Sequence, residues 1–265
     1  MNCPTKPALF FSSMAGVLAL FASPTATAAL LVDIGDAVGY VGTNTPAHQD
    51  GGLSAAEDTY FAFDVNASSF VTTTAFSSTI TLRAARNSNN TGDDVSNGSA
   101  PKRAQSSGAG VFATELTGDA ATSWDIANNG TERSPLGLEV AGLPDGQYTA
   151  YIVAPFGNYN YEQRTFAGVD TANRSTYSTS DFTYQDTLDI TTTAMWVEGD
   201  NYTAVNFTIT SGNSFYILVS DNSDNGISDY NTTLSSLEIV AVPEPATFAF
   251  VLGGMGLFLI SRRRR

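Results

Sequence analysis

Cysteine and histidine are almost missing from this sequence, since each occurs once among 265 residues. Cys3 lies in an N-terminal segment that we expect to be removed, so the mature protein would have no disulfide and no thiol chemistry. His48 alone cannot complete a histidine-based zinc site, and no serine-elbow motif accompanies it. These absences exclude a disulfide framework, a typical zinc centre and a Ser-His-Asp triad, and they favour a protein that is not an enzyme.

Positive charge is also scarce. Residues 29–242 contain seven Lys and Arg against 25 Asp and Glu, which gives this part of the chain a net charge of −18. Binding of nucleic acid relies on clustered cations that neutralise phosphates, so nucleic acid is excluded as a partner. An acidic surface favours solubility and cation binding, and it suits neutral or cationic polymers better than anionic ones.

Helical periodicity is weak everywhere except near the two ends of the chain. The composition is rich in Thr, Ser, Asn, Gly and aromatic residues, which favours strands joined by polar loops. Several short runs alternate apolar and polar residues with period two, as strands do. These runs are 60–65, 79–83, 148–154, 205–210, 215–219 and 237–241. The run 148–154 is apolar on both faces, as expected of a strand covered on both sides.

Turn residues separate these runs. Ser211-Gly212-Asn213 predicts a hairpin between two strands, and Leu143–Gly146 predicts a tight turn with Gly146 at the strained position. The stretch 87–110 has almost no apolar residues and predicts a long surface loop. Many short strands with turns between them predict an all-β protein in which residues 29–241 form a single β-sandwich domain.

Two segments resemble parts of a jelly-roll module of the galactose-binding or malectin-like kind. They are Gly142–Tyr148 and the closing strand Leu234–Ile239, which reads Leu-x-x-Leu-Glu-Ile. A fibronectin-like sandwich would show similar turns, so the type of sandwich stays open at this point.

The first 28 residues have the three parts of a signal peptide. Lys6 provides the positive charge, Ala8–Ala22 is the apolar region, and Ala26-Thr27-Ala28 supplies the small residues that a signal peptidase reads. We expect a signal-peptide helix here and cleavage after Ala28. The domain that follows would therefore be exported.

A second hydrophobic run, within residues 242–265, follows the domain. It is preceded by Pro243, Glu244 and Pro245, where the prolines fix φ and lack amide donors, so the tripeptide should be extended and accessible. The apolar residues predict a short transmembrane helix at 247–260. Four arginines then hold the end of this helix on the cytoplasmic side: Arg262, Arg263, Arg264 and Arg265.

This C-terminal arrangement resembles the PEP-CTERM sorting signal of Gram-negative bacteria. The Pro-Glu-Pro tripeptide, the following Ala246-Thr247, the glycines within the apolar run and the terminal arginines occur in the same order. The resemblance implies recognition by an exosortase, a membrane-embedded transpeptidase-like enzyme. It also implies anchoring in the inner membrane during transit, and then a place at the cell surface or in the extracellular matrix, often together with exopolysaccharide.

The loop after residue 220 is the best candidate for a metal site. It carries oxygen ligands at EF-hand-like positions 1, 3, 5 and 9: Asp221, Ser223, Asn225 and Asp229. Position 12 is Thr232 instead of glutamate, and no flanking helices are expected, which excludes a true EF-hand. One interpretation is a calcium site in a loop between strands. The other, which we favour, is an Asx-rich connection held by side chain-to-backbone hydrogen bonds.

A cluster of aromatic and polar residues is the candidate carbohydrate site. Tyr159 and Tyr161 could stack on the apolar face of a pyranose while Arg164 binds its hydroxyls. Trp124 and Trp196 could contribute in the same way. The alternative is that these rings belong to the core or to edge strands.

Taken together, these features predict a non-enzymatic, exopolysaccharide-associated protein of the cell surface or matrix, with no cofactor unless the loop described above binds calcium. One alternative is a secreted lyase or glycosidase with the same sorting tail, which would need two facing carboxylates about 5–10 Å apart. Another is a structural protein that self-associates through exposed edge strands.

Overall fold

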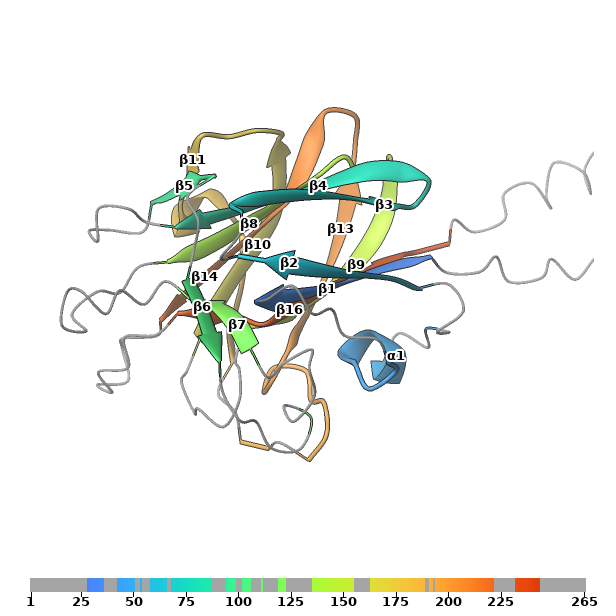
Figure 1. Cartoon of the computed structure of the whole chain (residues 1–265), viewed down its shortest axis with the longest axis vertical. Coiled ribbons are helices and arrows are strands. Elements are labelled where there is room, and N and C mark those ends of the chain that lie inside the picture. The colour runs from blue at the N-terminus through green and yellow to red at the C-terminus, as the bar shows by residue number, and fades with distance from the viewer. Residues whose placement is uncertain are drawn as a thin grey trace, which may run out of the picture. The chain divides into compact units, whose positions relative to one another are not determined.

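Strands account for nearly all of the regular structure (Figure 1). This computed structural model describes residues 28–35, 42–50, 53, 58–65, 68–86, 94–98, 102–105, 111, 119–122, 135–154, 163–188, 191–192, 194–221 and 232–243. All of them fall within one unit of the chain, Ala26–Glu244. The predicted signal-peptide helix and transmembrane segment lie outside these ranges. Within them, no helix has the length and apolar character that a membrane crossing requires.

A five-stranded sheet with the order β13-β9-β16-β1-β2 forms one layer. Its members are β1 (Ala29–Gly35), β2 (Asp58–Asp64), β9 (Gly146–Val153), β13 (Thr203–Ile209) and β16 (Ser236–Ala241). β1 and β2 run parallel, whereas the other neighbours are antiparallel. The last strand, β16, lies between β9 and β1, so the middle of this sheet is filled by the C-terminal end of the domain.

The opposite layer is an eight-stranded sheet. Along it the order is β11-β5-β4-β8-β14-β10-β12, and β3 also pairs with β4. Its members are β3 (Phe70–Ala75), β4 (Ser78–Arg86), β5 (Val95–Asn97), β8 (Leu136–Ala141), β10 (Gln163–Thr171), β11 (Thr176–Tyr177), β12 (Tyr184–Leu188) and β14 (Asn213–Asp221).

Smaller elements complete the described part of the chain. A three-stranded sheet contains β6 (Lys102–Gln105), β7 (Asp119–Thr122) and β15 (Thr233–Leu234). The helical elements in the described part of the chain include one short α-helix, α1 (Pro46–Asp50), and a 3-10 turn, η4 (Thr179–Asp181).

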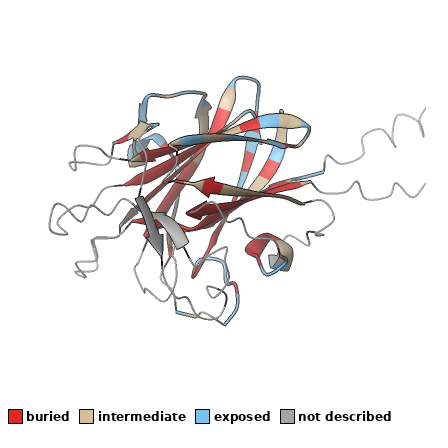
Figure 2. Ribbon diagram, viewed as in Figure 1, coloured by how far each residue is buried: buried red, intermediate tan, exposed pale blue. Residues whose placement is uncertain are grey.

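The two larger sheets pack face to face around one apolar core, and buried residues line their facing strands (Figure 2). Alternation directs every second residue of each strand inward, for example Phe63 in β2, Ile80 and Leu82 in β4, and Ile217 in β14. The rings of Phe207 in β13 and Phe215 in β14 stack across the layers with their centroids 3.9 Å apart. This packing confirms the prediction of an all-β, sandwich-like domain.

A second apolar cluster covers the outer face of the five-stranded sheet. Leu31, Tyr151 and Val240 project from the sheet and pack with Ala47 of α1 and Trp196. β9 and β16 are therefore buried on both faces, as the sequence predicts for the run 148–154.

Three local predictions are wrong. The turn at Ser211-Gly212-Asn213 does not form a hairpin, because β13 and β14 belong to different sheets and the turn carries the chain across the core. The stretch 87–110 contains β5 and β6, so it is not one long loop. The strained glycine of the turn before β9 is Gly142, with φ of 86°, instead of Gly146.

Gly142 provides a test of the packing between β4 and the turn before β9. A Cβ at this position would lie 2.2 Å from the carbonyl oxygen of Thr79, whereas a Cβ at Gly212, which has the same φ of 86°, would meet nothing within 4 Å. We expect Gly212→Ala to cost about 1–2 kcal/mol from left-handed strain alone, and Gly142→Ala to cost clearly more. Chemical denaturation of both variants measures the difference, and equal losses would contradict the close contact.

Candidate functional site

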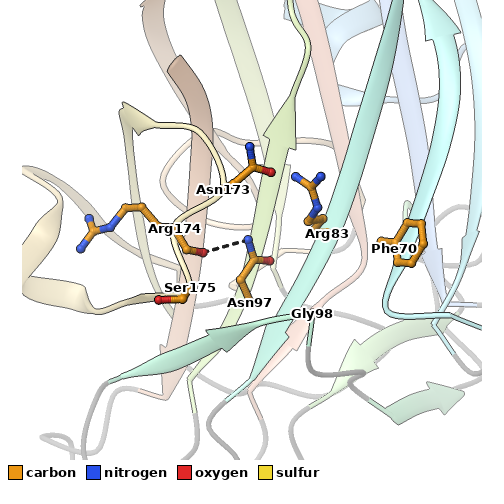
Figure 3. A pocket seen from close by; sticks show the side chains of 7 residues that line it. All are labelled: Phe70, Arg83, Asn97, Gly98, Asn173, Arg174 and Ser175. Carbon is orange, nitrogen blue, oxygen red and sulfur yellow. Dashed lines mark hydrogen bonds between the residues drawn. The ribbon is translucent and has the colours of Figure 1, made fainter. Parts of the chain in front are cut away.

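A pocket of about 300 Å³ opens on the eight-stranded sheet (Figure 3). It forms where β3, β4 and β5 meet the turn between β10 and β11. The lining residues are Phe70, Arg83, Asn97, Gly98, Asn173, Arg174 and Ser175. These residues come from four separate parts of the sequence, so the pocket exists only in the folded chain.

Strand pairing arranges the floor of this pocket. The neighbours of Arg83 along β4 point into the core, so Arg83 itself projects from the outer face. In the register of the sheet, Arg83 pairs with Phe70 of β3 on one side and with Glu139 of β8 on the other. Glu139 in turn pairs with Tyr216 of β14. These four side chains therefore form a row across four strands.

Glu139 is fully buried and joins the elements around the pocket. Its carboxylate oxygens accept hydrogen bonds from Asn97 Nδ2 (2.5 Å), the backbone amide of Asn173 (2.7 Å), Tyr216 Oη (3.1 Å) and Arg83 Nη1 (3.3 Å). Burial by itself would raise the pKa of Glu139, but the hydrogen bonds that its carboxylate accepts, first those from Asn173 and Asn97, outweigh it and lower the pKa below its ordinary value. Glu139 is thus an ionised anchor for its neighbours.

The turn between β10 and β11 forms one wall. Asn173 has φ of 63°, a left-handed conformation that asparagine tolerates better than most residues. Next to it, Arg174 accepts a hydrogen bond at its carbonyl from Asn97 Nδ2 (3.1 Å; Figure 3). The guanidinium of Arg174 pairs with Asp170 (2.6 Å) and Asp181 (3.1 Å). Burial alone would lower the pKa of Arg174, but these two carboxylates raise it.

The ring of Phe70 forms the opposite wall and is unusually exposed. The side chain is 58% exposed, and the side chain of Arg83 beside it is 30% exposed. An apolar ring next to a guanidinium and two amide side chains can contact an apolar face and hydroxyl groups of one ligand at once.

The charge around the pocket is slightly negative. Arg83 and Arg174 bring two positive charges, and their carboxylate partners Glu139, Asp170 and Asp181 bring three negative ones. A polyanion would therefore find no net attraction here, whereas a neutral polar ligand would meet N–H donors that are already held in place.

A second polar cluster lies between α1 and the outer face of the five-stranded sheet. Glu238 is fully buried and accepts a hydrogen bond from the amide of Ala47 (2.8 Å). His48 Nε2 lies 2.9 Å from Asp58 Oδ2, and His48 Nδ1 lies 2.7 Å from Thr45 Oγ1. Burial raises the pKa of Glu238 to about 8, and the nearby Asp58 adds to the rise. These contacts fasten α1 to the sheet.

Most site residues predicted from the sequence lie outside the described part of the chain. They are Trp124, Tyr159, Tyr161, Ser223, Asn225, Asp229, Glu244, Pro245, Arg262, Arg263, Arg264 and Arg265. Asp221 is the last residue of β14. Within the described ranges, no three His, Cys, Asp or Glu side chains are grouped as a metal site would require.

Three other candidate residues can be placed. Arg164 lies in β10, between Ser220 of β14 and Thr187 of β12, and is not among the residues that line the pocket. Trp196 is buried in the second cluster and its Nε1 donates to the carbonyl of Asn44, so it cannot be an exposed sugar platform. Pro243 is the second residue after the end of β16.

Sequence reasoning missed the pocket itself. Arg83 and Glu139 are charged residues inside apolar alternating runs, which was the available signal for an outward-facing or paired position. That signal does not reveal that the two residues share a row, because register between strands far apart in sequence is not encoded in either strand alone.

Comparison with known proteins identifies the C-terminal segment. Residues 241–265 match the PEP-CTERM protein-sorting motif. The match confirms the resemblance seen in the sequence and implies an exported protein that is anchored in the membrane for sorting by an exosortase. No curated protein matches the chain.

Two solved structures are similar in part. One is the ANXUR1 extracellular domain from Arabidopsis thaliana, at 10% identity and a TM-score of 0.35; the alignment covers 81% of this chain and 48% of that one, so the chain spans about half its length. The other is TmCBM61 in complex with beta-1,4-galactotriose, at 11% identity and a TM-score of 0.27, covering 60% of this chain and 83% of that one. At these scores neither likeness establishes a shared fold or ligand.

The raised pKa of Glu238 predicts how stability depends on pH. Because this pKa is about 8 in the folded chain and 4.5 ordinarily, the folded state keeps a proton that the unfolded state has released between these values. The free energy of unfolding should therefore fall as pH rises from about 5 to 8. Glu238→Gln keeps an acceptor for Ala47 without titrating, so it should melt a few degrees above wild type at pH 8. Thermal melts at pH 5, 6.5 and 8 test this, and parallel pH profiles would refute it.

Proposed function

We propose that this chain, which carries a PEP-CTERM sorting motif, is a non-enzymatic protein of the cell surface or extracellular matrix that binds a neutral saccharide. Its export and sorting follow from the motif. The ligand belongs to an exopolysaccharide of the Gram-negative host, and the binding site is the pocket between Phe70 and Arg174. Signal peptidase and exosortase act on the chain during transit through the inner membrane.

The pairing of Phe70 with Arg83 carries this proposal. The exposed ring of Phe70 offers a flat apolar face, and Arg83 lies opposite it in the register of β3 and β4. A pyranose presents the matching combination of an apolar face and hydroxyl groups at its rim. Arg83 is held by Glu139 before any ligand arrives, so little side-chain freedom would be lost on binding.

The slightly negative charge of the pocket supports a neutral ligand over an acidic one. The exported domain is strongly negative as a whole, so a uronate-rich polymer would be repelled before it reached the pocket. We include in the proposal that the sandwich is a jelly-roll of the galactose-binding kind. Calcium binding at Asp221–Asp229 stays a separate prediction.

A self-associating structural role is the second candidate, and β3 is the observation that favours it. Among the described strands β3 pairs only with β4, and its residues Phe70–Ala75 carry no charge in an otherwise acidic domain. An uncharged free edge can pair with another copy. Assembly that grows with protein concentration in the absence of glycan would favour this role over saccharide binding.

Replacement of Phe70 tests the proposed site. We expect Phe70→Ala to weaken binding of the host's purified exopolysaccharide or of neutral oligosaccharides by about tenfold, because the stacking contact is lost. Isothermal titration with the exported chain, with and without calcium, measures the effect. Unchanged affinity would overturn the site, and release of oligosaccharide products would instead favour the lyase or glycosidase alternative.

Two further variants separate binding from folding. Met195→Ala is a matched control, because Met195 is also 58% exposed but does not line the pocket; its affinity should equal wild type. Glu139→Gln should weaken binding although Glu139 is buried, because Arg83 and Asn97 would lose the carboxylate that positions them. A melting curve shows whether that variant is still folded.

A further inference from the structure

The sorting motif begins where the central sheet ends. β16 pairs along its whole length with β9, up to Ala241 opposite Tyr148. Beyond the strand, the amide of Val242 still donates to the carbonyl of Gln147 (2.9 Å). The next residue is Pro243, the first of the Pro-Glu-Pro tripeptide. No spacer separates the folded domain from the motif.

β16 cannot leave the sheet without opening the domain. It lies between β9 and β1, and Leu237 and Ile239 are fully buried in the main core. On the opposite face Glu238 is fully buried as well. Only the end of the strand can fray while the core stays intact, because Ala241 is half-buried and Val242, the residue after the strand, is exposed.

An enzyme that cuts a peptide bond takes in the chain as an extended segment on both sides of that bond. Between Val242 and the end of the tripeptide there are three residues, and three residues of any conformation span at most about 10 Å. An exosortase that needs residues before Pro243 must therefore compete with the sheet for Ala241 and Val242.

We propose that the folded sandwich itself limits access of the exosortase to the sorting motif. The bond that is broken lies beyond Val242. The acyl group on its N-terminal side passes to water or to an amine acceptor, and the released C-terminal anchor gains the proton on its new amino group. The folded domain therefore stays intact after cleavage. The rate of processing by the exosortase depends on how readily the end of β16 frays. This inference rests on the sorting motif and is independent of saccharide binding.

The N-terminal end of the domain takes part in the same control. The amide of Ala241 donates to the carbonyl of Ala28 (3.0 Å). Cleavage by signal peptidase after Ala28, as predicted from the sequence, would remove this acceptor. The hydrogen bond from the Val242 amide to the Gln147 carbonyl would then be the one nearest the motif that still holds it to the sheet. Removal of the signal peptide would therefore make cleavage by the exosortase easier.

Spacer insertion tests the proposal in the full chain. We would insert a spacer of two residues (Gly-Ser) or four residues (Gly-Ser-Gly-Ser) between Val242 and Pro243. Processing would be followed by pulse-chase in a Gram-negative host that has an exosortase. The spacers supply free residues before the motif, so the processing rate should rise by about tenfold and then level off with length. Equal rates for wild type and both spacer variants would overturn the proposal.

Three controls make the outcome specific. Pro243→Ala/Pro245→Ala in the four-residue spacer background should abolish processing, which shows that the motif is still what the enzyme reads. Thermal melts of the purified spacer variants should match wild type, because the insertion lies after the sheet. Intact mass of the processed wild-type protein should place its C-terminus at Val242 or later, because the broken bond lies beyond Val242; a C-terminus at Ala241 or earlier would refute the proposal. Saccharide binding of the spacer variants is measured separately, so either hypothesis can fail alone.

Discussion

The insertion of β16 between β9 and β1 is the contact on which the rest of the structure depends. It closes the middle of the five-stranded sheet and brings Leu237 and Ile239 into the main core. Its opposite face carries Glu238, which holds α1 through the amide of Ala47. A strand buried on both faces contributes more apolar contact than an edge strand of equal length. Because β16 is also the last of the described strands, this sheet is complete only once the C-terminal end of the exported domain is available.

Two buried glutamates show how local donors decide the state of a carboxyl group. Glu139 is surrounded by donors from four elements, and its pKa is lowered although it is fully buried. Glu238 is more strongly desolvated and lies near Asp58, and hydrogen bonds from Ala47 and Thr45 do not offset these effects, so its pKa rises to about 8. The ionised group orients an arginine and an asparagine at a pocket, whereas the protonated group fastens a helix to a sheet. The same residue type thus serves two different purposes.

Sequence reasoning recovered what is local in the chain. The alternation around Phe63, Ile80 and Leu82 predicted strands and their inward faces, and the order of residues after Val242 predicted the sorting motif. It failed where long-range pairing decides the outcome. The turn at Gly212 joins two sheets because β13 and β14 each find other partners, which the turn residues do not encode. The pocket was missed for the same reason, since it depends on the register that sets Phe70 beside Arg83.

The position of β16 also determines how the domain would carry a mechanical load. In Figure 1, β5 and β11, which flank the pocket, lie at the opposite side from the beginning of β1 and the end of β16. A polymer pulling at the pocket, against a tether at Val242, would stretch the sandwich along β16. Hydrogen bonds between antiparallel strands are perpendicular to the strands, so this tension would shear all the bonds to β9 and β1 together. Hydrogen bonds that are loaded together in shear resist force far better than hydrogen bonds that break one after another.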